Sequence, residues 1–267
     1  MPSPQSKTQH QEEAAPDTRR LTAAEILHAA MDNARDELRR SSQKLAFSGV
    51  AGGLTMGLTG LGVATMRALG GPGANPIVPY LVYPIGFIVV IIGRAQLFTE
   101  NTLYPVVLVL DERRHLLNTL RLWAVVFGSN VCGAFLFALL AVKTAALRPE
   151  ILSQLLQLGQ EASAGSAAHF FWSGVIGGWL IALVAWTVTG SQGTIGQFVV
   201  IYLLTFVVGI GRFAHCIAGG GEILSAVVAG SVSLGAYFQW LATATMGNIC
   251  GGVVIVSLLN YGQVKKL

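Results

Sequence analysis

The sequence predicts an all-α polytopic membrane protein with six transmembrane helices, arranged as two inverted repeats of three helices in which the second and fifth spans are broken. Composition gives the first indication: 53% of the 267 residues are hydrophobic, only 11% are charged, and the mean hydropathy is +0.61. The second is a pair of long apolar runs that polar residues interrupt. The third is a set of motifs that recur in the same order in both halves.

The first 44 residues are polar and divide into two parts. Residues 1–21 are rich in Ser, Gln, Pro and charge, which predicts a disordered cytoplasmic tail. An amphipathic cytoplasmic helix is predicted over 22–44, because Thr22 and Glu25 form a capping-box pattern. Apolar residues then recur at helical spacing along one face, at Leu27, Met31, Ala34 and Leu38. We expect this helix either to lie on the inner membrane surface or to pack beneath the bundle.

Six spans follow in two groups of three. The first group, 45–142, has spans at about 45–68 and 122–142, with the apolar run 77–110 between them. That run is too long for one span of about 20 residues and too short for two with a turn, so we expect a break at 94–101. The second group, 169–260, has spans at about 169–189 and 236–259 around a second broken run, 197–230.

Two further segments complete the chain. Residues 143–168 form an external connection between the groups, in which 150–158 is predicted as a short surface helix with its leucines toward lipid. Residues 261–267 form a second cytoplasmic tail. Placing both termini on the inner side of the cell (inner) membrane leaves twelve Lys and Arg residues in internal segments against three in or near external ones. The positive-inside rule therefore favours cytoplasmic termini.

Three motifs recur between the two groups. Residues 47–54 (FSGVAGGL) match 172–179 (WSGVIGGW), 125 positions later. Gly93-Arg94 matches Gly211-Arg212, and 130–133 (NVCG) matches 248–251 (NICG), both 118 positions later. With three spans per copy, the second copy enters the membrane from the opposite side. In such folds the two broken segments meet near the membrane midplane, so the two arginines should approach from opposite faces.

Arg94 and Arg212 are the two basic residues that membrane topology leaves unexplained. An arginine at the centre of a span costs about 2.5–3.5 kcal/mol on insertion scales, so it usually serves a pathway or pairs with an acid. Both interpretations stay open. The arginines bind an anion, or they form internal ion pairs with Glu100 or Glu222 that lock the broken helices.

Other classes of function have little support in the sequence. The basic residues cluster at the ends of apolar segments, which is typical of cytoplasmic anchors and not of nucleic-acid binding. The three cysteines lie inside apolar segments without zinc-ligand spacing, so no metal or cofactor is expected. An enzyme is not expected, because the spans contain no Ser/His/Asp set, HExxH motif or carboxylate pair.

Three segments resemble motifs of the formate/nitrite transporter family. Residues 97–102 (LFTENT) resemble the family's LFT-x-N/S motif, and residues 213–218 (FAHCIA) resemble its F-E-H-S-I-A segment. Residues 247–252 (GNICGG) resemble the G-N-x-x-G-G of the family's last helix. The resemblance covers about 22–262, and the order and placement of the motifs make it fairly specific.

The resemblance implies an aquaporin-like protomer of six helices, usually in a homopentamer, with a pore in each protomer for small monovalent anions of weak acids. Its polar centre falls on Thr99 and His215, beside Phe98 and Leu97. The family's hydrophobic constrictions fall on three further positions, Tyr83, Phe87 and Val208. A carboxylate cannot cheaply cross a dry constriction but the neutral acid can, so we expect His215 to relay a proton to the anion. The expected partners are therefore the anion, protons and the lipid bilayer.

Several family positions differ in this chain. Ala214 replaces the acid before the histidine, Gly219 replaces the asparagine four residues after it, and Gly178 replaces the asparagine of the fourth span. No basic residue stands at 163–168, where the family typically has a lysine that draws anions in. The sequence therefore indicates a divergent member, in which we expect the two arginines of the breaks to supply the positive potential.

Two other functions stay open. An aquaporin-like conduit for water or neutral solutes predicts two Asn-Pro-Ala loops, whereas this chain has one Asn75-Pro76 in a turn. A non-conducting membrane scaffold is compatible with the lost lysine and asparagines. Individual residues also have structural interpretations: a satisfied buried histidine, a threonine that caps a half-helix, aromatic packing, and interhelical bonds from Asn130 and Asn248.

Overall fold

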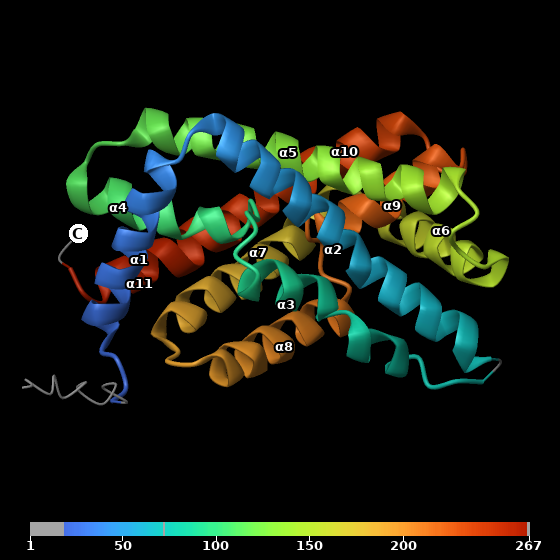
Figure 1. The fold of residues 1–267 in the computed structure, drawn as a ribbon, viewed down its shortest axis with the longest axis horizontal. Helices are drawn as coiled ribbons and strands as arrows, with labels where there is room; N and C mark the ends of the chain where they lie inside the picture. The colour runs from blue at the N-terminus through green and yellow to red at the C-terminus, as the bar shows by residue number, and fades with distance from the viewer. Residues whose placement is uncertain (1–18, 72, 266–267) are drawn as a thin grey trace, which may run out of the picture.

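The computed structural model describes residues 19–71 and 73–265, and every regular element in these ranges is a helix (Figure 1). Most of the tail predicted to be disordered, 1–18, lies outside the described residues. Five helices of the described part are long and apolar enough to cross a membrane: α2 (Ser42–Gly70), α5 (Leu116–Lys143), α7 (Ala167–Gly190), α8 (Thr194–Gly211) and the rod Leu234–Gly262.

The amphipathic helix α1 (Ala23–Arg39) packs against the bundle. Thr22 and Glu25 form the capping box that the sequence predicts. The helix ends before Lys44, because Arg40 is extended and the side chain of Ser41 caps the start of α2. Its apolar face is buried, mainly against α4 (Tyr104–Glu112), at Leu27, Met31, Ala34 and Leu38. Figure 1 shows α1 beside α4 at one end of the molecule. Of the two expected positions, the structure therefore has the helix packed onto the bundle.

Both long apolar runs are interrupted by irregular backbone. In the first, the helices are short: η1 (Val78–Val82), α3 (Ile85–Ile92), η2 (Glu100–Thr102) and α4. In the second, α8 ends at Gly211, and six residues separate it from the start of α9 (Ala218–Val228). Arg94 and Arg212 follow the ends of α3 and α8 with φ of 57° and 52°, the left-handed region that side chains rarely adopt. Both breaks thus begin with the same backbone reversal, at the matching Gly-Arg pairs.

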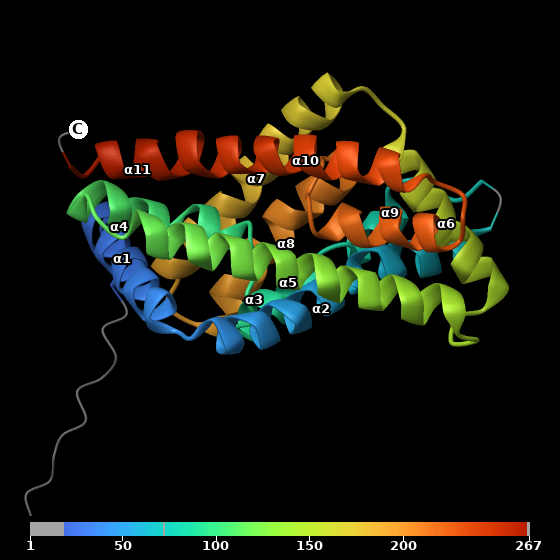
Figure 2. The same cartoon turned by 90° about the horizontal axis from the view of Figure 1, so that it is seen from above.

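Two helix pairs form the frame around the breaks. Helix α2 packs along α5, and α7 packs along α10 (Leu234–Cys250). Glycines allow the helices of each pair to approach closely. A Cβ added at Gly53 would overlap the carbonyl oxygen of Asn130, and one added at Gly178 would overlap that of Asn248. Figure 2 shows α10 continuing as a single rod, through the π-helical stretch Gly251–Leu258, into α11 (Leu259–Gly262).

The connection between the two groups contains α6 (Pro149–Ser163), which is longer than the predicted helix 150–158. The prediction that its leucines face lipid is wrong for Leu155 and Leu158, which are 0% and 4% exposed. The helix packs against α9 and α2 instead. Its contact with α9 is so close that a Cβ added at Gly159 would overlap the carbonyl oxygen of Glu222. The small residue lets α6 lie against the bundle and bury its apolar face.

The outer surfaces of the long helices carry large apolar side chains. Phe47 and Trp172, at the start of the matching motifs, are 73% and 67% exposed. Similar residues lie exposed along α8, at Ile195, Phe198, Val199, Leu203, Val207 and Ile210. Apolar residues in such numbers on the outside of helices of this length indicate surfaces that face lipid or other protein.

Candidate functional site at the meeting of the two breaks

The two breaks meet at a hydrogen bond between Thr99 and His215. The distance between Thr99 Oγ1 and His215 Nε2 is 2.8 Å, and both residues are buried. The backbone N–H of Ala218 donates to His215 Nδ1 at 3.1 Å. Because Nδ1 accepts that bond, a neutral ring carries its proton on Nε2 and donates it to Thr99. The contact joins segments that are 116 residues apart in the chain.

Asn130 of α5 holds the first break in place. Its Nδ2 donates to the carbonyl oxygens of Gly49 at 2.7 Å and Gln96 at 2.9 Å, and its Oδ1 accepts the N–H of Phe98 at 2.8 Å. Ser48 Oγ accepts the N–H of Gln96 at 3.1 Å. Backbone groups that the break leaves without helical partners are thereby satisfied inside the protein.

Asn248 of the last helix holds the second break in the same way. Its Nδ2 donates to the carbonyl oxygens of Gly174 and Ala214, both at 2.8 Å, and its Oδ1 accepts the N–H of Cys216 at 2.9 Å. Ser173 Oγ accepts the N–H of Ala214 at 2.9 Å. Every partner lies 118 or 125 positions after its equivalent in the first break, the same two offsets that separate the sequence motifs. The interhelical role expected for the two asparagines is confirmed.

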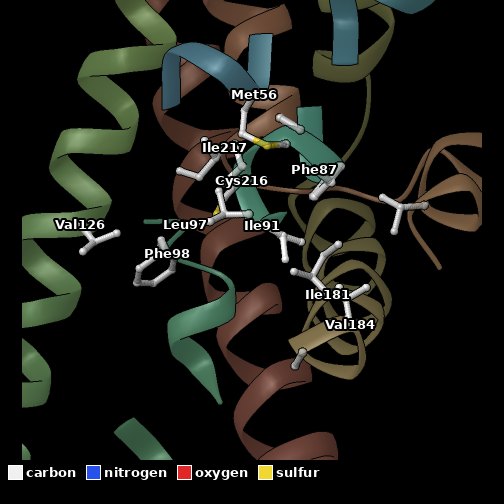
Figure 3. Close-up of a cluster of buried hydrophobic side chains, with 14 of the residues drawn as sticks. Met56, Phe87, Ile91, Leu97, Phe98, Val126, Ile181, Val184, Cys216 and Ile217 are labelled. Carbon is white, nitrogen blue, oxygen red and sulfur yellow. The ribbon is translucent and has the colours of Figure 1, made fainter. Parts of the chain in front are cut away.

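Apolar side chains surround the Thr99–His215 pair. The Phe87 ring packs edge-on against the His215 ring with centroids 5.0 Å apart, and Tyr83 lies 5.8 Å from Phe87. Leu97 and Val208 are also buried. Figure 3 shows Phe87, Leu97 and Ile91 among the buried side chains where the two breaks come together. Of the residues expected to form constrictions, Phe87 packs against the polar pair, and Tyr83 and Val208 lie in the wall of one cavity beside it.

Phe98 differs from its neighbours, because its ring packs toward α5. Its centroid lies 5.0 Å from that of Phe127 and 5.8 Å from that of Trp123, both in edge-on geometry. The Trp123 indole donates to the carbonyl oxygen of Asn101 at 2.8 Å. In this position Phe98 anchors the break to the frame.

A cavity lies on each side of the site. The Arg212 cavity has a volume of about 340 Å³ and reaches His215, with Tyr83, Val208 and Glu222 also in its wall. The Arg94 cavity has a volume of about 90 Å³ and reaches Leu97, with Gln96, Glu100 and Tyr104 in its wall. The polar pair and its apolar surroundings stand between the two cavities, each of which contains one arginine and one glutamate from a broken run.

The arginines do not form the ion pairs with Glu100 or Glu222 that were one of the two interpretations of the sequence. Arg212 forms an ion pair with Glu161 of α6 at 2.5 Å, and Glu161 also pairs with Arg67 of α2 at 3.1 Å. Glu222 is therefore not the direct partner of Arg212, because α6 lies over the break and supplies a carboxylate of its own. Within the described ranges, Arg94 has no acidic side chain within 4.0 Å, although Glu100 lines the same cavity. Both arginines are exposed to their cavities instead of being enclosed in helix packing.

The structure shows what a larger side chain would meet at Gly178 and Gly219, two of the positions that differ from the family motif. A side chain at Gly178 would overlap the carbonyl oxygen of Asn248, so an asparagine does not fit there without moving α10. A Cβ at Gly219 would lie 2.9 Å from the ring of Trp240, which occupies that part of the Arg212 cavity. Gly219 and Trp240 are therefore matched in size in the wall of the Arg212 cavity, whereas Gly178 allows α7 and α10 to approach closely.

Sequence reasoning missed several residues of the site. Ser48 and Ser173 stand inside the matching motifs 47–54 and 172–179, so their recurrence was a usable signal. Gln96 lines the Arg94 cavity and accepts a bond from Asn101 at 2.9 Å. Glu161 and Arg67 had no signal, because their pairing depends on how α6 folds back onto the bundle.

The fold is that of a helical membrane protein in which two interrupted segments meet at a buried polar pair. The sequence model of the family described as "Formate/nitrite transporter" matches residues 24–262, and the chain therefore belongs to that family. The protein is accordingly a multi-pass membrane protein of a transporter family.

Similar proteins agree with this placement. The "Inner membrane protein YfdC" of Escherichia coli (strain K12) is 32% identical over 235 residues, covering 86% of this chain and 75% of the relative. A solved "FNT family ion channel" superposes with a TM-score of 0.80 at 20% identity, over 89% of this chain and 98% of that one. A "Pentameric formate channel with formate bound" superposes with a TM-score of 0.70 at 18% identity, over 83% of this chain and 97% of that one.

Proposed function

We propose that this protein is a channel or proton-coupled transporter for small monovalent anions of weak acids, in which the anion takes a proton at His215. The observation that carries the proposal is the Thr99–His215 hydrogen bond, which lies between the Arg212 cavity and the Arg94 cavity. A titratable ring at that point stands where an anion would have to lose its charge to go further. The formate bound by the channel of similar fold supports the same class of substrate.

The proposal assigns a role to each group of site residues. Arg94 and Arg212 draw the anion into the two cavities by their charge. Thr99 and His215 bind it, and the proton that it takes from His215 Nε2 is replaced at that nitrogen from water. The buried side chains of Tyr83, Phe87, Leu97 and Val208 exclude water, so that the neutral acid crosses and the anion does not. Phe98 belongs to the pathway through its support of Thr99, the next residue in the chain.

The proposal includes a six-span architecture. The equivalent hydrogen bonds of Asn130 and Asn248 support two repeats of inverted topology, in which the first broken run counts as one span. We place both termini in the cytoplasm, so the Arg94 cavity faces inward and the Arg212 cavity faces outward. The pentamer of the formate channel of similar fold, together with the exposed apolar residues of α8, supports a homopentamer.

Uptake into proteoliposomes tests the function. Initial rates of uptake of labelled formate, nitrite, acetate and lactate are measured over a pH series, for the wild type and His215→Ala. We expect uptake to rise as the pH falls and to be lost in the variant. His28→Ala is the matched control, because His28 is exposed on α1.

The alternatives have different outcomes in the same experiment. Swelling in neutral solutes without anion uptake would identify a neutral-solute channel. Absence of both would indicate a non-conducting scaffold. Anion uptake that persists in His215→Ala with an unchanged pH profile would refute protonation at this residue while leaving an anion channel in place.

A further inference from the structure

Glu161 and Arg212, in the wall of the Arg212 cavity, form a cluster of three charged residues with Arg67, which we call the arginine clamp. A wider pocket of about 990 Å³ lies beyond it on the same side. Tyr80, Glu161 and Arg212 line both this pocket and the Arg212 cavity. A solute that moves from the wide pocket to His215 through this shared wall therefore passes Glu161 and Arg212.

The clamp holds one carboxylate with several donors. Arg67 donates to both oxygens of Glu161, at 3.1 and 3.2 Å. Arg212 donates to Oε2 at 2.5 Å, and Gln157 donates to Oε1 at 3.0 Å. A guanidinium that donates to both oxygens of a carboxylate is a geometry specific for planar anions with two oxygens. The clamp is thus a carboxylate-binding site that a carboxylate of the protein itself occupies.

The two arginines differ in how firmly they are held. Arg67 is 18% exposed, donates to the Tyr80 hydroxyl at 2.8 Å and stacks over the Tyr80 ring. Arg212 is 49% exposed, and Glu161 is its one acidic partner among the described residues. A half-exposed ion pair is worth only about 1 kcal/mol or less, so another anion can replace Glu161 at Arg212 while Arg67 retains it.

The charge of the clamp favours such an exchange. Two guanidinium groups share a single carboxylate, which leaves one positive charge over. When a second anion binds Arg212, each arginine has one anion, and Gln157 still holds Oε1 of Glu161. The exchange therefore leaves no charged group of the clamp without a partner.

We propose that Glu161 is a built-in competitor for the substrate: a small carboxylate or similarly planar anion binds Arg212 by displacing the Glu161 carboxylate, and Glu161 thereby sets the affinity of the cavity entrance. This inference rests on the proposed function, because it concerns the same pathway. It adds a specificity-determining residue from α6, a helix outside the two broken segments.

Equilibrium binding tests the inference without requiring flux. The purified protein in detergent is titrated with sodium formate, and the apparent Kd is taken from the rise in thermal unfolding temperature with formate concentration. Sodium chloride at the same ionic strength is the comparison. We expect Glu161→Gln to lower the apparent Kd for formate about three- to fivefold, the factor that corresponds to removal of a half-exposed ion pair. Asp36→Asn, which removes an exposed carboxylate paired with Arg39 on α1, should leave the Kd unchanged.

Two further variants separate competition from a structural latch. Arg212→Gln should weaken formate binding, and in that background Glu161→Gln should have no further effect. Arg212→Lys keeps the charge but removes the planar donor pair, so it should reduce the preference for formate over chloride. A Glu161→Gln variant that binds formate no better than the wild type, or improves chloride and formate binding equally, would overturn the inference.

The outcomes also separate this inference from the proposed function. If the wild type takes up formate and Glu161→Gln neither binds it more tightly nor lowers the KM of uptake, the competitor role fails and the transport function stands. If the wild type takes up none of the four anions, the transport function fails. The formate titrations still decide whether the clamp exchanges its carboxylate.

Discussion

The hydrogen bonds of Asn130 and Asn248 allow a quantitative test of how the breaks are stabilised. Each side chain satisfies two buried carbonyl groups and one buried N–H group, and both residues are fully buried. Alanine at either position leaves these three backbone groups without the partner. A side-chain hydrogen bond between membrane helices is worth about 0.6 kcal/mol on average, and a buried polar group left unpaired costs about 1–3 kcal/mol.

From these values we expect Asn130→Ala and Asn248→Ala each to lower the free energy of unfolding by about 2–4 kcal/mol. Because the two sets of bonds are equivalent, the two losses should agree within about 1 kcal/mol. The assay is titration of the protein in mixed micelles with a denaturing detergent. Asn260→Ala is the control, because Asn260 is partly buried and its two bonds are local to its own helix end: it donates to the carbonyl oxygen of Val256 and accepts from the side chain of Gln263.

A large loss for one asparagine and none for the other would refute the reasoning. It would mean that the two breaks are held by different forces in spite of their matching bonds. Equal losses no larger than that of the Asn260 control would mean that water or a shifted backbone satisfies the freed groups.

Three more predictions concern single residues. Thr99→Val removes the group that accepts from His215, so we expect a lower rate of anion uptake and a displaced pH profile, measured in proteoliposomes. Gly53→Ala should destabilise the protein by about 2 kcal/mol or more because its Cβ overlaps a carbonyl of α5, whereas Gly128→Ala, with open space around it, should be nearly neutral in the same unfolding assay. Hydrogen bonds from Arg35, then Arg114 and His115, lower the pKa of Glu112 from 4.5 to about 2. The stability that Glu112 contributes should therefore be complete above pH 4.5 and disappear as the pH falls toward 2, so that wild type and Glu112→Gln converge in acid; a constant difference would contradict the ionic origin.

Much of the architecture could be predicted, because helix capping and the thickness of the membrane constrain which residues stand at each position. The capping box at Thr22 follows from local chemistry, and the interruption of 77–110 follows from a run too long for one span. The boundary between α1 and α2 was missed, because Ser41 starts a new helix inside what reads as a continuous helical pattern.

The polar centre was predictable for a different reason. Thr99 and His215 stand in motifs that resemble a known family, and the structure brings the two side chains into contact. The partner of Arg212 could not be predicted, since Glu161 is 51 residues away on a helix expected to lie at the lipid surface. Sequence periodicity shows that a helix has an apolar face, but it does not show which neighbour covers that face.

The bond from Ala218 to His215 has a consequence for the stoichiometry of transport. Because Nδ1 accepts a hydrogen bond from a backbone amide, Nε2 is the one ring nitrogen that can exchange a proton with the anion. In the neutral ring Nε2 already carries a proton, so it can accept another only after the first has passed to the anion. The proton that leaves and the proton that replaces it use the same nitrogen, and no proton crosses the ring from one side to the other. In the mechanism proposed above, each proton that reaches the far compartment must then travel on the permeating acid, and proton and anion should appear there one for one.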